Sequence, residues 1–485
     1  MASTPARPRF AIVGAGVAGV LAAIKLREAG FDDIVVYEKA DRLGGTWRDN
    51  TYPGIACDVP SHLYSYSFAP NPEWSHVFSP GAEIQRYFET VATAYDVDPL
   101  ICFGEEVRSL RFDGNGWLVE TDARRDRADF VIAATGVLHH PRYPDISGLD
   151  TFRGPCFHTA RWDHDVRLEG ARVGVIGTGS SGVQVIGAIA NRVGRLVVFQ
   201  RTAQWVLPAE NPPISADDRA RFRADVQAMQ TLRAELNRGF VENFADAVVD
   251  AGSPILQRVE ELCRANLEGT VADPDLRERL RPDYRAACKR LVVSPNYYES
   301  LCLPHVQVID DPIASIEPAG VRTAGGDLHE LDALVLATGF QIDRFLRPID
   351  VTGTVGMRLD DVWSDGPVAY LSVSMPGFPN LFMLNGPNGP VGNFPLIDVA
   401  EMQCDYVLQL IDSALGRNAP VSATQEATDR FEAERIEATK RTIWVSGCRS
   451  WYLDHRGIPV AWPWPMARFR EVMAAPDLRD YEYAE

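Results

Sequence analysis

The sequence predicts an α/β protein made of two Rossmann-like dinucleotide-binding domains with a helical insertion. Two observations predict the Rossmann-like domains: a GxGxxG fingerprint occurs twice, over 14–19 and 177–182, and each copy lies between two short apolar runs. The third observation concerns 209–287, where apolar residues recur every three or four positions, as on one face of a helix.

The first fingerprint begins the N-terminal domain. Its three glycines are Gly14, Gly16 and Gly19. The apolar run 10–13 predicts a strand, 17–28 a helix and 34–38 a second strand, which together form a unit that directs helix-terminal N–H groups at a pyrophosphate. Glu38 follows Gly19 at the distance where an acid accepts hydrogen bonds from an unphosphorylated ribose, so we expect FAD here.

The second fingerprint repeats this plan. Its residues are Gly177, Thr178, Gly179, Ser180, Ser181 and Gly182. Strands are expected over 173–176 and 196–199, with a helix over 182–191 between them. Arg201 follows at the same distance as Glu38, and a base there accommodates a 2′-phosphate, which indicates NADP(H). A chain that binds FAD and NADPH is most simply a flavin enzyme that takes a hydride from NADPH.

The remaining patterns divide the chain into discontinuous domains. We expect an FAD-binding domain over 1–148 and 340–485, an NADP-binding domain over 150–208 and 288–339, and a helical insertion over 209–287. Apolar runs that start at Arg290 and Leu331 predict further strands, and the second ends in an Ala-Thr-Gly turn that repeats the turn at 134–136. The apolar face of the insertion is expected to pack in the interior; the alternative is that it lines a substrate entrance.

Composition limits the class of protein. A chain of 485 residues should form two or three domains, and 46% hydrophobic with 24% charged residues is ordinary for a globular protein. A net charge of −18 argues against a general nucleic-acid or anionic-membrane surface. Apolar runs stay below the ~20 residues of a membrane span, and the polar N-terminus lacks the apolar core of a signal peptide, so a cytoplasmic location is expected.

The eight cysteines include no closely spaced pair, which argues against a disulfide framework, a zinc site and a dithiol relay to a flavin. Most of these thiols are therefore expected to be small buried hydrophobes. His139 and His140 have no third candidate ligand near them in the sequence, so no metal is assigned.

A further motif lies between the two fingerprints. Phe152-Arg-Gly154-Pro-Cys-Phe-His158-Thr-Ala-Arg-Trp162-Asp163 resembles the FxGxxxHxxxW(P/D) fingerprint of type I Baeyer–Villiger monooxygenases, which are class B flavoprotein monooxygenases. Sister flavin-containing and N-hydroxylating monooxygenases usually end a similar motif with an aromatic residue other than this Trp-Asp pair. For His158 a structural, hydrogen-bonding role is expected; the alternative couples domain movement to turnover.

Other segments resemble the same family. They are 44–47, 52–54, 57–60 and 64–68 on the flavin side, 200–205 on the NADP side, 288–291 with the catalytic arginine, and 448–453 with a C-terminal Ser-Trp element. The following Asp454-His-Arg-Gly-Ile-Pro departs from the Gly-Ala-Asn-Ile-Pro-Gly-Lys of the cyclic-ketone enzymes. The class of ketone therefore stays open.

The resemblance implies a reaction in which NADPH reduces FAD, O₂ adds to the flavin, and the flavin peroxide attacks a ketone to give an ester or lactone. The negative adduct needs a fixed cation in a dry site, and Arg suits this need because it keeps its charge and offers a fork of donors. By resemblance Arg290 is this cation and Asp58 is its carboxylate partner. The alternatives are an N- or S-oxygenating flavin monooxygenase and a non-catalytic flavin-binding redox sensor.

The resemblance also implies the other cofactor contacts. Arg201, Lys289 and Thr202 are expected at the 2′-phosphate. Trp47 and Tyr64 are expected beside the flavin and Trp451 at the border of NADP and substrate; for these three aromatic residues, plain core packing is the alternative. The remaining cofactor-binding residues of the prediction are Gly45, Thr46, Asp58, Val107 and Arg290.

Overall fold

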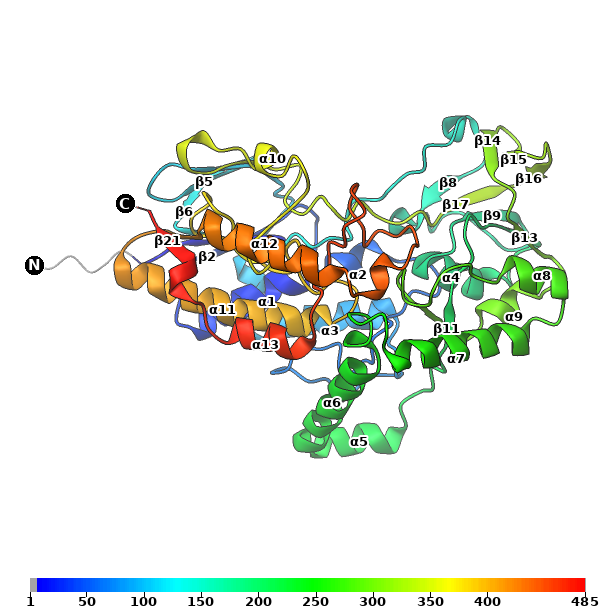
Figure 1. Ribbon diagram of the computed structural model, residues 1–485, viewed down its shortest axis with the longest axis horizontal. Helices are drawn as coiled ribbons and strands as arrows, with labels where there is room; N and C mark the ends of the chain where they lie inside the picture. Colours follow the sequence, from blue (N-terminus) through cyan, green and yellow to red (C-terminus); the bar gives the residue numbers. More distant parts are fainter. Residues whose placement is uncertain (1–6, 485) are drawn as a thin grey trace, which may run out of the picture.

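Two five-stranded parallel sheets organise the chain, one in each of two lobes (Figure 1). The computed structural model describes residues 7–484; residues 1–6, which belong to the polar N-terminal stretch considered above, and residue 485 lie outside the described residues. The sheet of the first lobe has the order β19-β7-β1-β2-β3. Its strands are β1 (Phe10–Val13), β2 (Ile34–Glu38), β3 (Ile101–Phe103), β7 (Phe130–Ala133) and β19 (Leu381–Met383).

Both faces of this first sheet are buried, which explains its continuous apolar runs. In β1, Phe10 and Ile12 pack on the helical side, whereas Ala11 and Val13 face a second cluster beneath a smaller sheet. The helices of this lobe are α1 (Val17–Glu28), α2 (Thr46–Asp49), α3 (Gly81–Ala94), α10 (Leu359–Val362), α11 (Leu396–Arg417), α12 (Gln425–Thr439) and α13 (Met466–Ala474).

The smaller sheet of the first lobe has the order β18-β4-β5-β6. Its strands are β4 (Val107–Phe112), β5 (Trp117–Thr121), β6 (Arg125–Ala128) and β18 (Asp350–Thr352), and a separate pair is formed by β20 (Val421–Ala423) and β21 (Tyr481–Tyr483). Since β18 and β19 both come from beyond residue 340, the C-terminal part of the chain completes the lobe that the N-terminal part begins.

The sheet of the second lobe has the order β13-β10-β9-β17-β8. Its strands are β8 (Cys156–His158), β9 (Arg172–Ile176), β10 (Arg195–Phe199), β13 (Val306–Ile309) and β17 (Ala333–Leu336), with helices α4 (Ser180–Ile189) and α9 (Tyr297–Leu301) and the hairpin strands β14 (Ile313–Glu317), β15 (Gly320–Thr323) and β16 (Leu328–Glu330). The prediction of an α/β fold with two such domains is confirmed.

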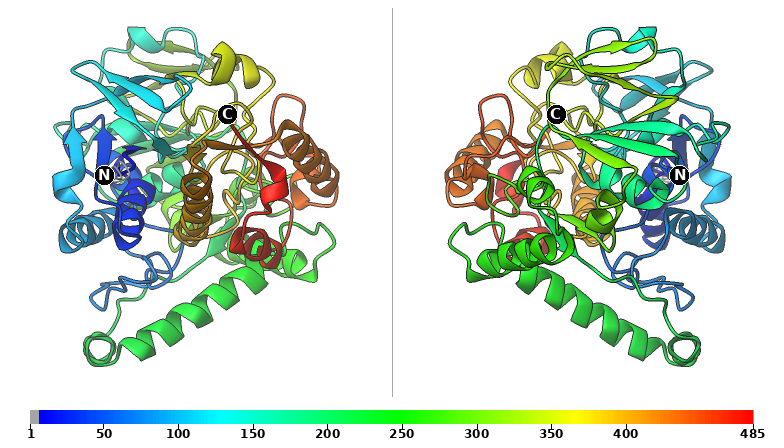
Figure 2. Two further views of the ribbon diagram at one scale, coloured as in Figure 1. Left: turned by 90° about the vertical axis from the view of Figure 1, so that its left-hand side faces the viewer. Right: turned by 90° about the vertical axis from the view of Figure 1, so that its right-hand side faces the viewer.

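The segment after β10 is helical, as expected. It contains α5 (Ala216–Ala224), α6 (Val226–Phe240), a π-helical turn (Val241–Ala245), α7 (Pro254–Thr270) and α8 (Pro274–Arg279), and it is closed by the paired strands β11 (Val206–Pro208) and β12 (Val292–Ser294). Figure 2 shows α5 and α6 extending below the lobes. Phe222 and Met229 are buried, but Val226 is 52% exposed, because little of the chain covers that end of α6.

Two sequence expectations need correction. The strand predicted to start at Arg290 begins at Val292, because Arg290 and Leu291 lie in irregular backbone outside the β11–β12 pairing. The cysteines also do more than pack as hydrophobes, since Cys288 and Cys448 form a disulfide across a sequence separation of 160. Their distance along the chain gave no sign of this pairing.

Candidate active site

A continuous cavity of about 2320 Å³ runs between the two lobes. Residues of both glycine fingerprints line it, as do Asp58 and Arg290. Its walls therefore come from the carboxyl ends of the two parallel sheets, which is where open α/β sheets bind their ligands.

The two fingerprints fold alike. Gly14 and Gly177 adopt φ +103° and +107°, values that favour glycine. A Cβ on Gly19 would stand 1.8 Å from the carbonyl oxygen of Gly14, and one on Gly182 would stand 2.2 Å from that of Gly177. Glycine is thus required for α1 and α4 to approach their strands, and each helix starts at the cavity wall, where its N–H groups suit a pyrophosphate.

Glu38 ends β2 inside the first lobe and is 4% exposed. Its carboxylate accepts hydrogen bonds from the backbone N–H groups of Ala15 and Ala40, both at 2.9 Å. It also pairs with the Arg48 guanidinium at 2.9 Å. Sequence reasoning missed Arg48, which is buried and lines the cavity. The fixed carboxylate retains acceptor capacity for a ribose hydroxyl.

The aromatic residues expected beside the flavin lie together. The indole N–H of Trp47 donates to the Tyr64 hydroxyl at 3.1 Å, and the two rings meet edge to face at 5.6 Å. Both line the cavity, together with Gly45, Thr46 and Val107. Burial raises the pKa of Tyr64, so its hydroxyl keeps its proton.

Two asparagines add polar groups that the sequence reasoning did not single out. Asn385 and Asn388 belong to the turn-rich segment after β19 and line the cavity. Their buried side-chain oxygens have no hydrogen-bond partner among the described residues. Because buried polar groups are normally paired, these oxygens suit donors of a bound ligand.

Asp58 and Arg290 form an ion pair, although 232 residues separate them in the sequence. The second arm of the guanidinium donates to the carbonyl oxygen of Gly392 at 3.3 Å. The negative charge of Asp58 raises the pKa of Arg290, so the arginine stays charged at any working pH. The pair combines residues of both lobes and faces the cavity with about a quarter to a third of each side chain exposed.

Arg201 and Lys289 place two positive charges at the second fingerprint. Arg201 is exposed and has no ion-pair partner within 7–484. Burial and the charge of Arg201 lower the pKa of Lys289, while the charge of Asp283 raises it. The Lys289 ammonium lies over the Tyr284 ring, 4.3 Å from its centroid. Thr202 lies beside them on the cavity wall. Two adjacent cations without a carboxylate bridge suit a doubly charged phosphate.

The C-terminal loop supplies Trp451 and Tyr452 to the same cavity. Their rings lie 4.1 Å apart, and the Tyr452 hydroxyl donates to the Gly392 carbonyl at 3.4 Å, the acceptor that Arg290 also uses. Tyr452 is thus a near neighbour of the ion pair that the sequence analysis did not assign.

His158 is fully buried at the end of β8. Its Nδ1 accepts from the N–H of Ala160 at 3.1 Å, and its Nε2 then carries the proton donated to the Gly339 carbonyl at 3.0 Å. Burial lowers the pKa of His158 to about 4. Both ring nitrogens are used within the fold, which supports the structural role.

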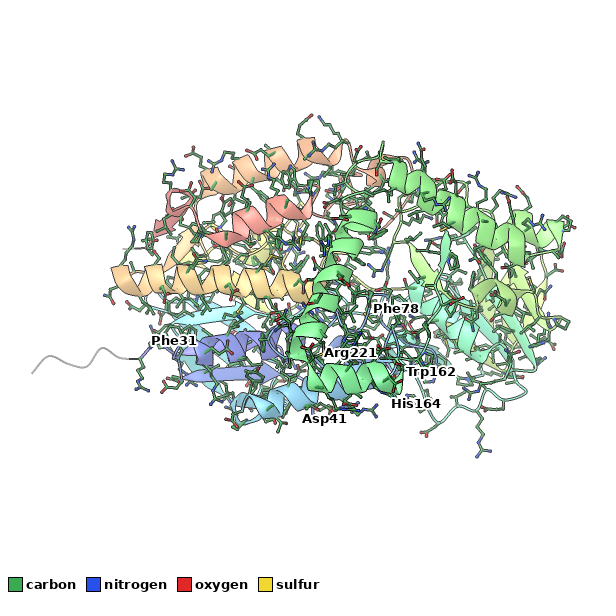
Figure 3. All side chains as sticks on the ribbon, turned by 90° about the horizontal axis from the view of Figure 1, so that it is seen from below. Phe31, Asp41, Phe78, Trp162, His164 and Arg221 are labelled. Atoms are coloured by element: carbon green, nitrogen blue, oxygen red, sulfur yellow. A yellow bond between two sulfur atoms is a disulfide. The ribbon has the colours of Figure 1, made fainter. Side chains whose placement is uncertain are left out.

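The end of the same motif reaches the first lobe. Figure 3 shows Trp162 and His164 together on the side of the second lobe that faces the first. The His164 ring bonds to the Thr51 hydroxyl at 2.8 Å, so this segment connects the lobes directly.

The helical insertion reaches the cavity mainly near its centre, with further contacts from Ala209 and Val259. Phe240, Asn243 and Phe244 line the wall where α6 passes into the π-helical turn. The expectation that this apolar face serves packing is therefore incomplete, and the π-helical turn fits this position because such turns are frequent at functional sites.

Comparisons with known proteins agree with this geometry. Residues 11–242 match the family model described as pyridine nucleotide-disulphide oxidoreductase. The chain is 47% identical to an uncharacterized monooxygenase of Mycobacterium tuberculosis, covering 98% of this chain and 96% of that protein. It is 41% identical to a Baeyer–Villiger monooxygenase of Streptomyces coelicolor, with 98% and 92% covered.

Among solved structures, cyclohexanone monooxygenase from Rhodococcus bound to NADP⁺ superposes with a TM-score of 0.88 at 31% identity, covering 99% of this chain and all of that one. The glycine-lined helix starts, the paired cations and the cavity fit FAD and NADPH, which are the cofactors of this group. Within residues 7–484, no group of three or more His, Cys, Asp or Glu side chains could hold a metal ion. No helix in this range is long and apolar enough to cross a membrane. The chain belongs to the type I Baeyer–Villiger monooxygenases, flavin enzymes that use NADPH and O₂ to convert ketones to esters or lactones.

Proposed function

We propose that Arg290, fixed by Asp58, is the cation that stabilises negative charge during oxygen insertion into the ketone. The ion pair on the cavity wall is the observation that carries this proposal. When bound, FAD accepts a hydride from NADPH and activates O₂. The guanidinium contributes a permanent charge and directed N–H donors that need no rearrangement during the reaction.

We infer the other contacts from the residues that line the cavity. Arg201, Lys289 and Thr202 bind the 2′-phosphate of NADPH, and Glu38 binds the ribose of FAD. Trp47 and Tyr64 lie beside the flavin, and Gly45, Thr46 and Val107 also contact FAD. Trp451 lies at the border of NADP and substrate. FAD then belongs to 1–148 and 340–485 and NADP to 150–208 and 288–339. The two parallel sheets support this division.

The substrate is a ketone with a substantial apolar part. Aromatic side chains line the cavity from two segments: Phe240 and Phe244 come from the insertion, and Trp451 comes from the C-terminal loop. Apolar surface removed from water contributes about 25 cal/mol per Å², so these rings would dominate the affinity for a weakly polar ketone. For the enzyme itself we propose a cytoplasmic location, where NADPH is regenerated.

The role of Arg290 is tested by separating flavin reduction from oxygen insertion. Arg290→Ala should still be reduced by NADPH, yet form little ester and release hydrogen peroxide, because one preorganised donor contributes about 10²–10³ in rate. Arg290→Lys should also be severely impaired, since an ammonium lacks the planar fork. Stopped-flow flavin bleaching and ester analysis decide this on the same protein. Normal ester yield from Arg290→Ala would remove the residue from the mechanism.

A further inference from the structure

The disulfide between Cys288 and Cys448 joins two loops of the active site. Their Cα atoms lie 6.1 Å apart. Cys288 immediately precedes Lys289 and Arg290, and Cys448 stands three residues before Trp451. The bond therefore connects the segment of the proposed catalytic cation to the C-terminal loop that supplies Trp451 and Tyr452 to the cavity.

Neither loop has its position fixed by regular structure. Arg290 lies in the irregular segment between the turn at 286–287 and β12. The C-terminal loop runs from 446 to 465 without a helix or strand, apart from one isolated bridge between Leu453 and Pro459. A covalent bond at the start of this loop consequently has more influence on its position than the same bond would have inside a helix.

The surroundings of the bond are apolar. Cys288 is fully buried and Cys448 is 7% exposed. They share one hydrophobic cluster, whose other buried members are Ala247, Val248, Val249, Leu256, Ala287, Ile443, Trp444, Tyr452 and Ala461. Tyr452 stacks on Trp444 at 5.2 Å, and its hydroxyl and Arg290 use the same carbonyl acceptor. The position of this loop is thus transmitted to the guanidinium through a short chain of contacts.

Oxidation of the pair has an available oxidant. Two thiols and one hydrogen peroxide give one disulfide and two waters, so each sulfur loses one electron and one proton. When no ketone is consumed, a flavin monooxygenase can convert NADPH, O₂ and one proton into NADP⁺ and hydrogen peroxide. Reduction needs a dithiol, which exchanges with the bond and leaves as its own disulfide. Disulfides in reducing compartments are usually transient and redox-sensing.

We propose that Cys288 and Cys448 form a redox-controlled tether. In the oxidised enzyme the bond fixes the C-terminal loop against the Arg290 segment, and reduction releases it. This proposal rests on the proposed role of Arg290. Peroxide released in wasteful turnover would then promote the tethered state, in which oxygen insertion is best supported.

The first experiment asks whether the bond forms. Purified holoenzyme is treated with hydrogen peroxide, alkylated without reductant, digested and examined by mass spectrometry. A cross-linked pair of peptides containing Cys288 and Cys448, which dithiothreitol separates, is expected. If peroxide treatment still yields Cys288 and Cys448 in separate, alkylated peptides, the proposal is overturned.

The second experiment asks what the bond does. Reduced wild-type enzyme and Cys448→Ser should show kcat for ester formation lowered by about tenfold to a hundredfold, because small displacements of positioned groups have effects of this size. The KM for the ketone should change little, and more NADPH should end as hydrogen peroxide. Reoxidation should restore the wild type but not Cys448→Ser. Cys302→Ser is the matched control, since Cys302 is an exposed, unbonded cysteine outside the cavity.

The two proposals fail differently. Unchanged kcat and peroxide yield on reduction would show that the bond serves only stability and would refute the tether. Arg290→Ala tests the proposed function separately. A normal ester yield from this variant would refute the role of Arg290, and the expected kinetic effect of the bond would lose its basis, but the cross-linked peptides would still show that the bond forms.

Discussion

Replacement of Asp58 by Asn isolates the electrostatic part of the ion pair. The amide has nearly the size of the carboxylate but carries no charge. In the structure, Arg290 has two directional contacts: the ion pair with Asp58 and a weak hydrogen bond of 3.3 Å to the Gly392 carbonyl. After Asp58→Asn only the weaker contact stays unchanged, so the guanidinium should sample several orientations.

The magnitude follows from the geometry. A hydrogen bond to a charged group contributes about 1.5–3 kcal/mol. The two side chains are 33% and 26% exposed, and solvent screening therefore places the loss near the lower end of this range. A loss of about 1.5–2 kcal/mol corresponds to roughly a 10- to 30-fold fall in the rate of ester formation. Arg290→Ala, which removes the donors themselves, should have the larger effect of about 10²–10³.

The assay measures flavin bleaching by NADPH, ester and hydrogen peroxide on one preparation. Asp58→Asn should bleach at a nearly normal rate but divide its NADPH between ester and peroxide. Asp398→Asn is the matched control, because Asp398 also pairs with an arginine, Arg233, at 14% exposure, outside the cavity wall. It should lower the melting temperature without changing ester per NADPH. Wild-type ester formation by Asp58→Asn, or an equal loss in Asp398→Asn, would refute the reasoning.

Three further outcomes are expected. Arg201→Ala should lower the preference for NADPH over NADH by about tenfold or more, measured as the ratio of the two kcat/KM values; an unchanged ratio would place the phosphate elsewhere. Because burial lowers the pKa of His158 to about 4, the unfolded chain protonates first, so stability should fall as pH drops from about 6.5 towards 4. The melting temperature of His158→Gln should depend less on pH in that window, and equal slopes would contradict this. Phe244→Ala should raise kcat/KM for bulky ketones relative to small ones while flavin reduction keeps its rate; an unaltered ketone preference would exclude this wall from substrate contact.

Much of the fold could be predicted because its signals are local. The first two strands were expected over 10–13 and 34–38, and β1 and β2 have these bounds. Apolar runs beside a glycine turn leave few alternatives, since both faces of the sheet must be buried and the helix must start where only glycine fits. The expected start of the strand at Arg290 was two residues early, because the apolar run gives no local signal that Arg290 and Leu291 stay outside the β11–β12 pairing.

The site residues that belong to a motif could be predicted from the sequence. Contacts made by backbone groups, or by residues far apart in the sequence that no motif connects, could not. The resemblance led to the Asp58–Arg290 pair, which the structure brings together. The Gly392 carbonyl that Arg290 and Tyr452 share has no sequence signal, because every residue carries such a group. The partner of Cys288 could not be chosen either, since a thiol that will cross-link looks like any small apolar residue.

The late arrival of β19 has a consequence for synthesis of the chain on the ribosome. This strand pairs with β7, so the edge of β7 stays unpaired until the polypeptide has grown by roughly 250 residues, a wait of about 10–50 s at ordinary elongation rates. All strands of the second sheet emerge during that interval. The nascent chain therefore completes its second lobe first and exposes an aggregation-prone strand edge in the meantime. Any release before residue 381 would leave that edge permanently open.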